Sequence, residues 1–200
     1  DDCASSVPGL FAAGDAATRE RICGGFTGGG SHNAAWAMSS GSWAGTGAAR
    51  YALSVGRGST SGLRGAGTVG LRNPARTGFT ADYVVKAAQA QLIPFDKNYL
   101  RSGDRVSAAL AELESLWGAV SADLGADPAG RMAARQAAAI TAVGRWMYHS
   151  TLARTETRGM SKRDDYPELD GTQHHHVLTG GLDSVWTRTS EPVGSALVAS

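Results

Sequence analysis

His32 is the residue whose type and place in the sequence suggest a catalytic role most directly. It follows three consecutive glycines at 28–30 and precedes an alanine-rich stretch with the composition of a helix. The positive end of a helix dipole disfavours imidazolium, so a histidine in the first turn is expected to be neutral and able to donate a hydrogen bond or a proton. His32 is therefore the candidate catalytic residue. The alternative is a structural role, because single histidines have many non-catalytic uses.

Gly14 and Asp15 form a second candidate site. They follow a Pro8-Gly9 turn and the short apolar run Leu10–Ala13, which predicts a buried strand. A glycine lets a ligand approach the backbone closely, and the carboxyl end of a strand is where open α/β sheets place ligand contacts. The pattern therefore predicts a ligand contact at Gly14 and Asp15.

Three other patterns favour plain structural roles. The run His174–His176 has no carboxylate or cysteine at metal-ligand spacing, which predicts solvated or packing side chains and no metal site. Cys3 and Cys23 are too few for an iron–sulfur cluster; a disulfide between them is conceivable, but two thiols in a chain of this length favour a reduced, cytoplasmic protein. Glycines 65, 67 and 70 match the dinucleotide fingerprint GxGxxG, yet neither a strand before them nor a helix before Pro74 supports it, so we expect a loop.

Charged residues of both signs gather near the end of the last long helix that the sequence predicts. The basic members alternate with acidic ones: Arg158, Lys162 and Arg163 with Glu156, Asp164 and Asp165. We interpret them as a surface salt network between this helix and the following turn, rather than as catalytic groups.

Composition limits the kind of protein. The chain has 200 residues, 42% of them hydrophobic, and a formal net charge of +1, which excludes a disordered tail and gives no overall field to attract nucleic acid. No apolar run is long enough to span a bilayer. Most of the 27 glycines lie in the first 80 residues and the second half is rich in alanine, which predicts two organisational units.

One long helix is predicted in the first unit, over Ala34–Leu53, with Ser31 or Asn33 as its N-cap. Small residues recur at every fourth position along it: Ala37, Gly41, Gly45 and Ala49. Because glycine costs about 1 kcal/mol relative to alanine inside a helix, this stripe indicates close packing against a sheet, a helix or a flat cofactor.

The second unit reads as a bundle of three helices. Thr80–Leu92 predicts the first helix, and a second begins at Asp104 with a seam of apolar residues at spacings of three and four: Val106, Leu110, Leu113, Trp117, Val120 and Leu124. Pro128 is expected to open the third, which runs to about Arg158. Its expected inward residues are Ile140, Val143 and Met147, and its expected outward ones are Arg131, Arg135 and Arg145. Beyond Gly159 we expect extended chain with a turn at Asp165-Tyr166-Pro167.

Two segments resemble the succinate dehydrogenase/fumarate reductase flavoprotein superfamily, which includes L-aspartate oxidase and the alpha subunit of adenylylsulfate reductase. The first is Val7-Pro8-Gly9-Leu10-Phe11-Ala12-Ala13-Gly14-Asp15, followed by a glycine-rich loop and Ser39-Ser40-Gly41-Ser42-Trp43-Ala44-Gly45. The second, from Glu156 to Asp170, is similar to the superfamily signature E-[ST]-R-G-x-x-x-R-x-D-[FY]-P-x-x-D. The two motifs stand in the superfamily's order, with a helical bundle between them.

The resemblance implies FAD as cofactor. It places Gly14 and Asp15 at the ribityl chain, and the backbone N–H groups of Ser39 and Ser40 at the N1/O2 edge of the isoalloxazine, where a helix N-terminus stabilises the anionic reduced flavin. In this alignment the flavin-facing helix begins at Ser39-Ser40, whereas the capping pattern begins it at Ser31 or Asn33. Both starts remain open at the level of sequence.

The chain also departs from the superfamily pattern. The N-terminal dinucleotide fold is absent, which implies a fragment or one subunit of a split flavoprotein. Residues 26–30, Phe-Thr-Gly-Gly-Gly, stand where succinate and fumarate enzymes carry Asn-Arg-Leu-Gly, so the dicarboxylate-clamping arginine is missing. The run from Ser39 to Trp43 resembles the adenylylsulfate reductase branch more closely, although that branch's histidine does not align with His32.

We therefore expect an α+β fold: residues 1–58 as the C-terminal edge of an FAD-binding α/β domain, 59–78 as a glycine-rich linker, and 79–200 as a helical domain of the three-helix type with an extended tail. The expected function is part of an FAD-dependent oxidoreductase that transfers hydride and passes electrons to a separate carrier. Its expected partners are an N-terminal FAD-binding polypeptide and an iron–sulfur or quinone-linked protein, with no nucleic acid and no transmembrane segment. The alternatives are a non-catalytic helical module that docks on a partner and a flavin dehydrogenase acting on a steroid or another apolar ring.

Overall fold

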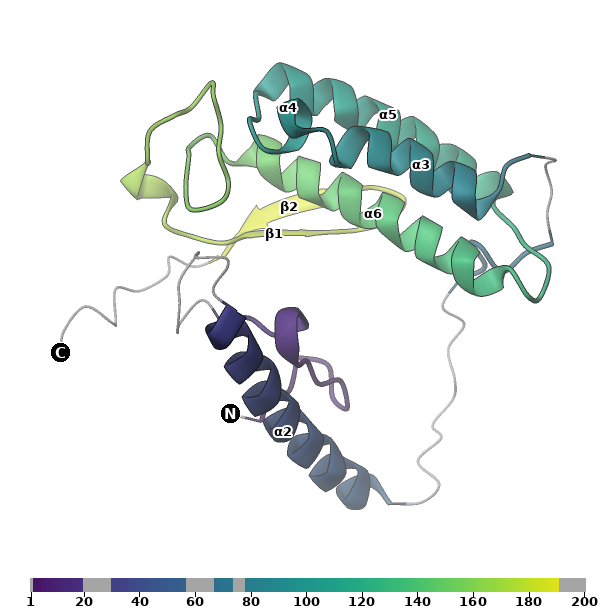
Figure 1. Cartoon of the computed structure of the whole chain (residues 1–200), viewed down its shortest axis with the longest axis vertical. Helices are drawn as coiled ribbons and strands as arrows, with labels where there is room; N and C mark the ends of the chain where they lie inside the picture. Colours follow the sequence, from purple (N-terminus) through teal and green to yellow (C-terminus); the bar gives the residue numbers. More distant parts are fainter. Residues whose placement is uncertain (1, 20–29, 57–66, 74–77, 191–200) are drawn as a thin grey trace. The chain divides into compact units, whose positions relative to one another are not determined.

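A computed structural model describes residues 2–19, 30–56, 67–73 and 78–190 of the chain. Its contacts divide the chain into two compact units, Asp1–Gly65 and Ala66–Ser200 (Figure 1). The described residues form an α+β structure that is mostly helical, as the sequence predicts. They also carry one small two-stranded sheet, in the stretch expected only to be extended. No helix in the described ranges is long and apolar enough to cross a membrane.

The first unit consists of one long helix and the segment that precedes it. Helix α2 spans Gly30–Val55, and a 3-10 turn, η1, spans Gly14–Ala16. The strand predicted at Leu10–Ala13 is wrong: this stretch forms only an isolated antiparallel bridge between Ala4 and Phe11. Within the described residues it has no neighbouring strand with which to build a ladder, so its backbone pairs locally instead.

Residues 2–17 pack against α2 through a glycine that the predicted stripe does not include. A Cβ at Gly47 would lie 2.8 Å from the Phe11 ring and 3.0 Å from the Asp2 backbone oxygen, so only glycine admits this close approach. Phe11 then meets Tyr51 edge to face, with ring centroids 6.4 Å apart. At Gly41 and Gly45, by contrast, no described atom lies within 4 Å of a Cβ.

The second unit is built on three packed helices, α3 (Ala81–Leu92), α5 (Gly103–Asp123) and α6 (Arg131–Ala153). A short helix, α4 (Phe95–Asn98), joins α3 to α5. After α6 come the turn η2 (Gly171–Gln173) and a hairpin of β1 (Val177–Gly180) and β2 (Trp186–Thr189), in which Val177 lies opposite Thr189. The hairpin runs alongside α6 (Figure 1).

The first two helices of the bundle match their sequence patterns. The Thr80 side chain caps α3 by accepting the Tyr83 N–H, and the Ser102 side chain caps α5 by accepting the Arg105 N–H. The whole predicted seam of α5 is buried: Val106, Leu110, Leu113, Trp117, Val120 and Leu124.

Helix α6 differs from its prediction. It begins at Arg131 rather than at Pro128, which lies in the preceding turn, and it ends at Ala153. Four alanines, Ala134, Ala137, Ala138 and Ala142, make up much of its buried face, which also includes Thr141, Gly144, Tyr148 and Thr151. Ile140 and Val143 are 37% and 54% exposed. Met147 packs partly buried against the core, as predicted, but Arg145, expected outside, is only 2% exposed. Alanines let α3 and α5 approach α6 closely, and that approach sets the face.

Candidate functional site

The turn at Gly14 is held on helix α2 by three hydrogen bonds. The Gly14 N–H donates to the Ser40 Oγ at 2.9 Å. The Trp36 indole Nε1–H donates to the carbonyl oxygens of Gly14 at 2.9 Å and of Ala17 at 3.3 Å. Sequence analysis missed Trp36, whose only available signal was a large aromatic side chain with a polar tip, next to Ala37 of the small-residue stripe but not part of it. These bonds fix the path of the η1 backbone.

Ser40 is fully buried and both hydrogen-bonding functions of its hydroxyl are used within the protein. It accepts from Gly14 and donates to the Trp36 carbonyl oxygen, with an Oγ–O distance of 2.5 Å. The structure therefore brings Gly14 and Ser40 together, and it places the Ser40 hydroxyl on the turn rather than on a ligand. Ser39, the neighbouring residue, is half-buried.

Gly14 and Asp15 leave one side of the turn open. Gly14 has φ +60°, in the left-handed region that favours glycine, and no described atom lies within 4 Å of where its Cβ would be. The Asp15 side chain is exposed. A ligand can thus reach the backbone at Gly14 and a carboxylate beside it, and these two residues fit a cofactor contact of the kind predicted.

The start of α2 is settled within the described residues. The helix is already formed at Gly30, so Ser31, Asn33, Ser39 and Ser40 all lie inside it. The interpretation that the helix begins at Ser39-Ser40 is wrong, and so is Ser31 or Asn33 as its N-cap. The Asn33 side chain instead accepts a hydrogen bond from Arg19, which ties the end of the preceding segment to the first turn.

His32 lies exposed in the first turn of α2, as the sequence predicts. It stands two helical turns before Ser40 in the sequence. Among the described residues, the side chains that hydrogen-bond to Gly14 are those of Trp36 and Ser40. The glycine-rich loop at residues 26–29 lies outside the described residues, and so does Cys23. The Cys3 thiol is free and half-buried.

The second motif forms a buried ionic cluster in the other unit. Glu156 has no exposed surface and binds Arg154 and Arg158, with shortest N–O distances of 2.5 and 2.7 Å. Its Oε2 also accepts the backbone N–H of Asp170 at 2.8 Å. Burial alone would raise the pKa of Glu156, but the hydrogen bonds from Arg158, Asp170 and Arg154 together lower it.

Arg163 and Asp165 complete this cluster. The Arg163 Nη1 donates to the carbonyl oxygens of Thr151 and Arg154 at the end of α6, and its Nε and Nη2 hold the Asp165 carboxylate in two parallel bonds of 2.8 Å. Asp165 Oδ2 accepts the Gly103 N–H at the start of α5. The hydrogen bonds from Arg163 hold the pKa of Asp165 well below its usual range. Of the predicted surface network, Lys162, Asp164 and Asp165 are exposed and Arg158 is half-buried, whereas Glu156 and Arg163 are buried. The network joins the end of α6 to the start of α5.

A second ionic group joins the hairpin to the bundle. Buried Arg145 pairs with Glu114 at 2.7 Å, stacks over the Trp117 ring and donates to the Leu182 carbonyl oxygen. Glu114 also contacts His149, at 3.0 Å. Arg145 is buried because these partners neutralise its charge and accept its hydrogens.

The three consecutive histidines, His174–His176, lie between η2 and β1. His174 and His176 are exposed, and the described residues contain no group of three or more side chains able to hold a metal ion. His175 contributes its backbone, because its carbonyl oxygen accepts a bond from Arg154 at 2.6 Å.

Comparison with known proteins finds similarity in structure only. No protein-family model matches the chain, and no curated protein matches it in sequence. Among solved structures it is similar to the FrdA chain of E. coli quinol fumarate reductase carrying the E245Q mutation, with a TM-score of 0.73 and 18% identity over 100% of this chain and 36% of that one. A chain of the Mycobacterium smegmatis Sdh1 complex in the apo form gives a TM-score of 0.47 and 20% identity, over 64% of this chain and 23% of that one.

The FrdA chain is that of a quinol fumarate reductase, so this similarity does not support the expected closeness to the adenylylsulfate reductase branch. The chain spans little more than a third of the length of the FrdA chain. At this level of identity the likeness concerns the fold, and it extends over all of the chain. The protein therefore has the fold of one part of FrdA, a chain of a quinol fumarate reductase.

Proposed function

We propose that the chain is part of an FAD-dependent oxidoreductase of the succinate dehydrogenase/fumarate reductase flavoprotein superfamily. The observation that carries the proposal is the match in fold to FrdA across the whole chain. The two sequence motifs support it independently, since they were recognised from residue types alone and stand in the superfamily's order.

Gly14 and Asp15 are proposed to hold the ribityl part of FAD. The open face of Gly14 lets the cofactor approach the backbone, and the exposed Asp15 carboxylate can accept hydrogen bonds from hydroxyl groups. Ser40 and Trp36 position this turn through the hydrogen bonds described above. When bound, FAD supplies a group that accepts or gives up a hydride.

The remaining site residues are proposed from their place on α2. His32, exposed in the first turn, is the proposed substrate contact. Ser39 and Ser40 remain proposed cofactor-binding residues. Ser40 would contribute by holding Gly14 in place, because its own hydroxyl group already donates and accepts a hydrogen bond within the protein. A helix N-terminus carries a partial positive charge, so the start of α2 favours an anionic group placed before it.

The reaction partners are also proposals. An N-terminal FAD-binding polypeptide or segment would supply the rest of the cofactor site, and an iron–sulfur or quinone-linked protein would exchange electrons, in a cytoplasmic setting. FrdA is named for fumarate, but residues 26–30 of this chain carry no cation to bind a dicarboxylate. We therefore leave the substrate open, with a steroid or another apolar ring as the alternative.

An Asp15→Ala substitution in the native protein or complex that contains this chain tests the proposal. The purified variant should retain less flavin than the wild type, because a ribityl contact is lost; flavin released on denaturation is measured by its visible absorbance. Asp183→Ala, which removes an exposed carboxylate from the hairpin turn, is the matched control and should leave flavin content unchanged.

Two results would count against the proposal. A wild-type protein without flavin would favour the non-catalytic docking module. Equal flavin content in the Asp15→Ala variant and the wild type would remove Asp15 from the cofactor site.

A further inference from the structure

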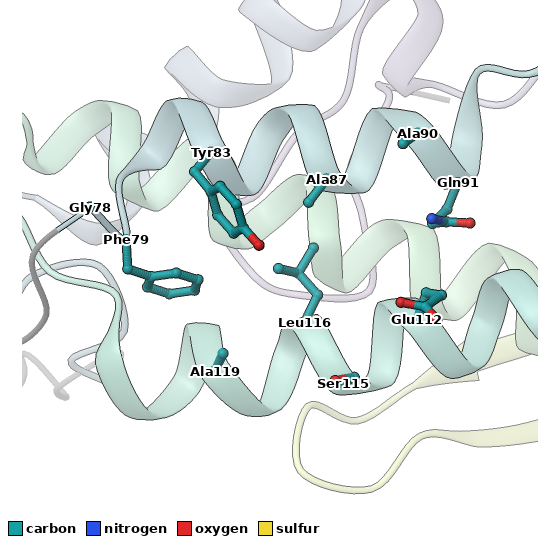
Figure 2. Close-up of a pocket in the computed structure, with 10 residues that line it drawn as sticks. All are labelled: Gly78, Phe79, Tyr83, Ala87, Ala90, Gln91, Glu112, Ser115, Leu116 and Ala119. Atoms are coloured by element: carbon teal, nitrogen blue, oxygen red, sulfur yellow. The ribbon is translucent and has the colours of Figure 1, made fainter.

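A hollow of about 500 Å³ in the second unit identifies no ligand. It lies between α3 and α5, with Tyr83 and Gln91 on one wall and Glu112 and Leu116 on the other (Figure 2). Nothing in the described part of the chain shows what would cover it. The first unit, by contrast, holds a cationic side chain in a defined place on the helix that carries the proposed site.

The segment that precedes α2 runs along this helix toward its first turn. Its residues form hydrogen bonds in succession with side chains of one helix face, spaced by four and three residues: Gly14 with Ser40, Ala17 with Trp36 and Arg19 with Asn33. Because an α-helix rises about 1.5 Å per residue, the contact at Asn33 lies about 10 Å along α2 from the contact at Ser40. The segment thus links the turn proposed to hold FAD to Arg19 at the start of α2.

Asn33 orients the Arg19 guanidinium. Its side-chain oxygen accepts a hydrogen bond from Arg19 Nη1, and both side chains are half-buried. An amide oxygen does not neutralise the cation, and a guanidinium has five N–H donors. Within the described part of the chain no carboxylate forms a salt bridge with Arg19. The bond to Asn33 therefore positions a positive charge without cancelling it.

The position of Arg19 distinguishes it from the other arginine of this unit. The part of the first unit that the structure describes contains two arginines and no lysine, and the second arginine is Arg50. Arg50 is exposed and lies about five helical turns beyond His32. Arg19 instead bonds to Asn33, the neighbour of His32 in the first turn of α2. Of the two, Arg19 lies at the end of α2 that carries the proposed substrate contact.

We propose that Arg19 binds an oxyanion group of the substrate, a carboxylate or a sulfate, at the start of α2. This inference rests on the proposed function, in which residues 26–30 supply no cation for an anionic substrate. A guanidinium pairs with an oxyanion through two parallel N–H···O bonds, which fix the orientation of the bound group. A neutral substrate leaves the half-buried cation unpaired, so Arg19 selects an anionic substrate over a steroid or another apolar ring.

Nuclear magnetic resonance of the ¹⁵N-labelled full chain tests anion binding without any cofactor. Acetate or sulfate is added at constant ionic strength, with chloride as the reference anion, and the arginine Nε–H signals are followed. We expect a saturable shift of one signal, assigned to Arg19 by its absence from the Arg19→Gln variant. The backbone N–H signals of His32 and Asn33 should shift with the same dissociation constant.

Three variants identify the binding residue. Arg19→Gln removes the charge and should weaken anion binding, followed at the His32 signal, by about tenfold or more. Arg50→Gln makes the same change in charge at an exposed position of α2 and should bind like the wild type. Asn33→Ala keeps the cation but removes its anchor, and should weaken binding about threefold. Circular dichroism shows whether each variant is folded. Equal binding by the Arg19→Gln and Arg50→Gln chains, or shifts that do not saturate, would overturn the proposal.

The flavin of the native protein or complex shows whether the bound anion lies at the cofactor. Acetate or sulfate should change the visible flavin absorbance in the wild type and in Arg50→Gln but not in Arg19→Gln, while all three retain the same amount of flavin. A native protein without flavin would contradict the proposed function, and the resonance titration would still decide whether Arg19 binds an anion. Anion binding at Arg19 that leaves the flavin spectrum unchanged would overturn its assignment to the substrate.

Discussion

At the scale of single residues, Glu156 and Arg163 show what sequence spacing could and could not reveal. The signature from Glu156 to Asp170 was recognisable from residue types, and so was the pairing of charges within it. Its burial was not, because a run of alternating charges has the same pattern on a surface and in a cluster. Only the fold brings Asp165 to the Gly103 N–H and Arg163 to the last carbonyl oxygens of α6.

Removal of the Glu156 carboxylate should therefore be costly. Glu156→Ala leaves the guanidinium groups of Arg154 and Arg158 without their buried partner, and we expect a loss of about 3 kcal/mol in the free energy of unfolding, measured with urea. Glu168→Ala, an exposed change in the same segment, should stay within about 0.5 kcal/mol of the wild type. Equal effects of the two substitutions would mean that the cluster contributes little.

The same carboxylates make stability depend on acidity. Hydrogen bonds from Arg163 lower the pKa of Asp165. Hydrogen bonds from Arg158, Asp170 and Arg154 outweigh the effect of burial and lower the pKa of Glu156. Hydrogen bonds from Thr172 and Gln173 lower the pKa of Asp170 to about 2. A carboxyl group whose pKa is lower in the folded chain than in the unfolded chain stabilises the fold above its unfolded-state pKa, which is about 4. This stabilisation is lost as the pH falls toward the pKa of the group in the folded chain.

We expect the urea concentration at the midpoint of unfolding to decrease as the pH is lowered from about 5 to about 2. The double variant Asp165→Asn, Glu156→Gln should be less stable at pH 7 and should lose part of this dependence, because two of the titrating groups are gone. A wild-type midpoint that stays constant or rises on acidification would contradict the assignment.

At the scale of helices and strands, local patterns predicted where helices occur along the chain better than which face of each helix is buried. The limits of α3 and the seam of α5 followed from capping residues and apolar spacing, which are local properties. The buried face of α6 could not be predicted from its local pattern. The alanines lie in the interface, and Ile140 and Val143 outside it, because α3 and α5 pack close to α6. The prediction of a strand at Leu10–Ala13 was wrong for a similar reason. A strand needs neighbouring strands to pair with, and the residues of the segment itself do not show whether these are present.

The alanine face of α6 gives a direct test of this packing. Ala137→Leu adds volume at a position with no exposed surface, so it should destabilise the bundle by about 2 kcal/mol through overpacking. Ala139→Leu places the same side chain on the exposed face of the same helix and should change stability by less than about 0.5 kcal/mol. Thermal unfolding of both variants distinguishes the two faces, and similar melting temperatures would contradict the buried assignment.

At the scale of the whole molecule, the chain shares its fold with part of FrdA, and the η1 turn leaves Gly14 and Asp15 accessible. The order of the two motifs predicted a resemblance to the superfamily, and the comparison with FrdA supports the fold that this resemblance implies. The link between Gly14 and Ser40 was not predictable, because 26 residues separate them and the hydrogen bond depends on how the preceding segment lies along α2.

Photo-crosslinking with an azido derivative of FAD tests the central claim most directly. The native protein or complex that contains this chain is loaded with the reagent, irradiated and digested, and the labelled peptides are identified by mass spectrometry. The account predicts label on the peptide that contains Gly14 and Asp15, suppressed by an excess of unlabelled FAD. A protein that binds no flavin, or label confined to peptides outside the first unit, would contradict it.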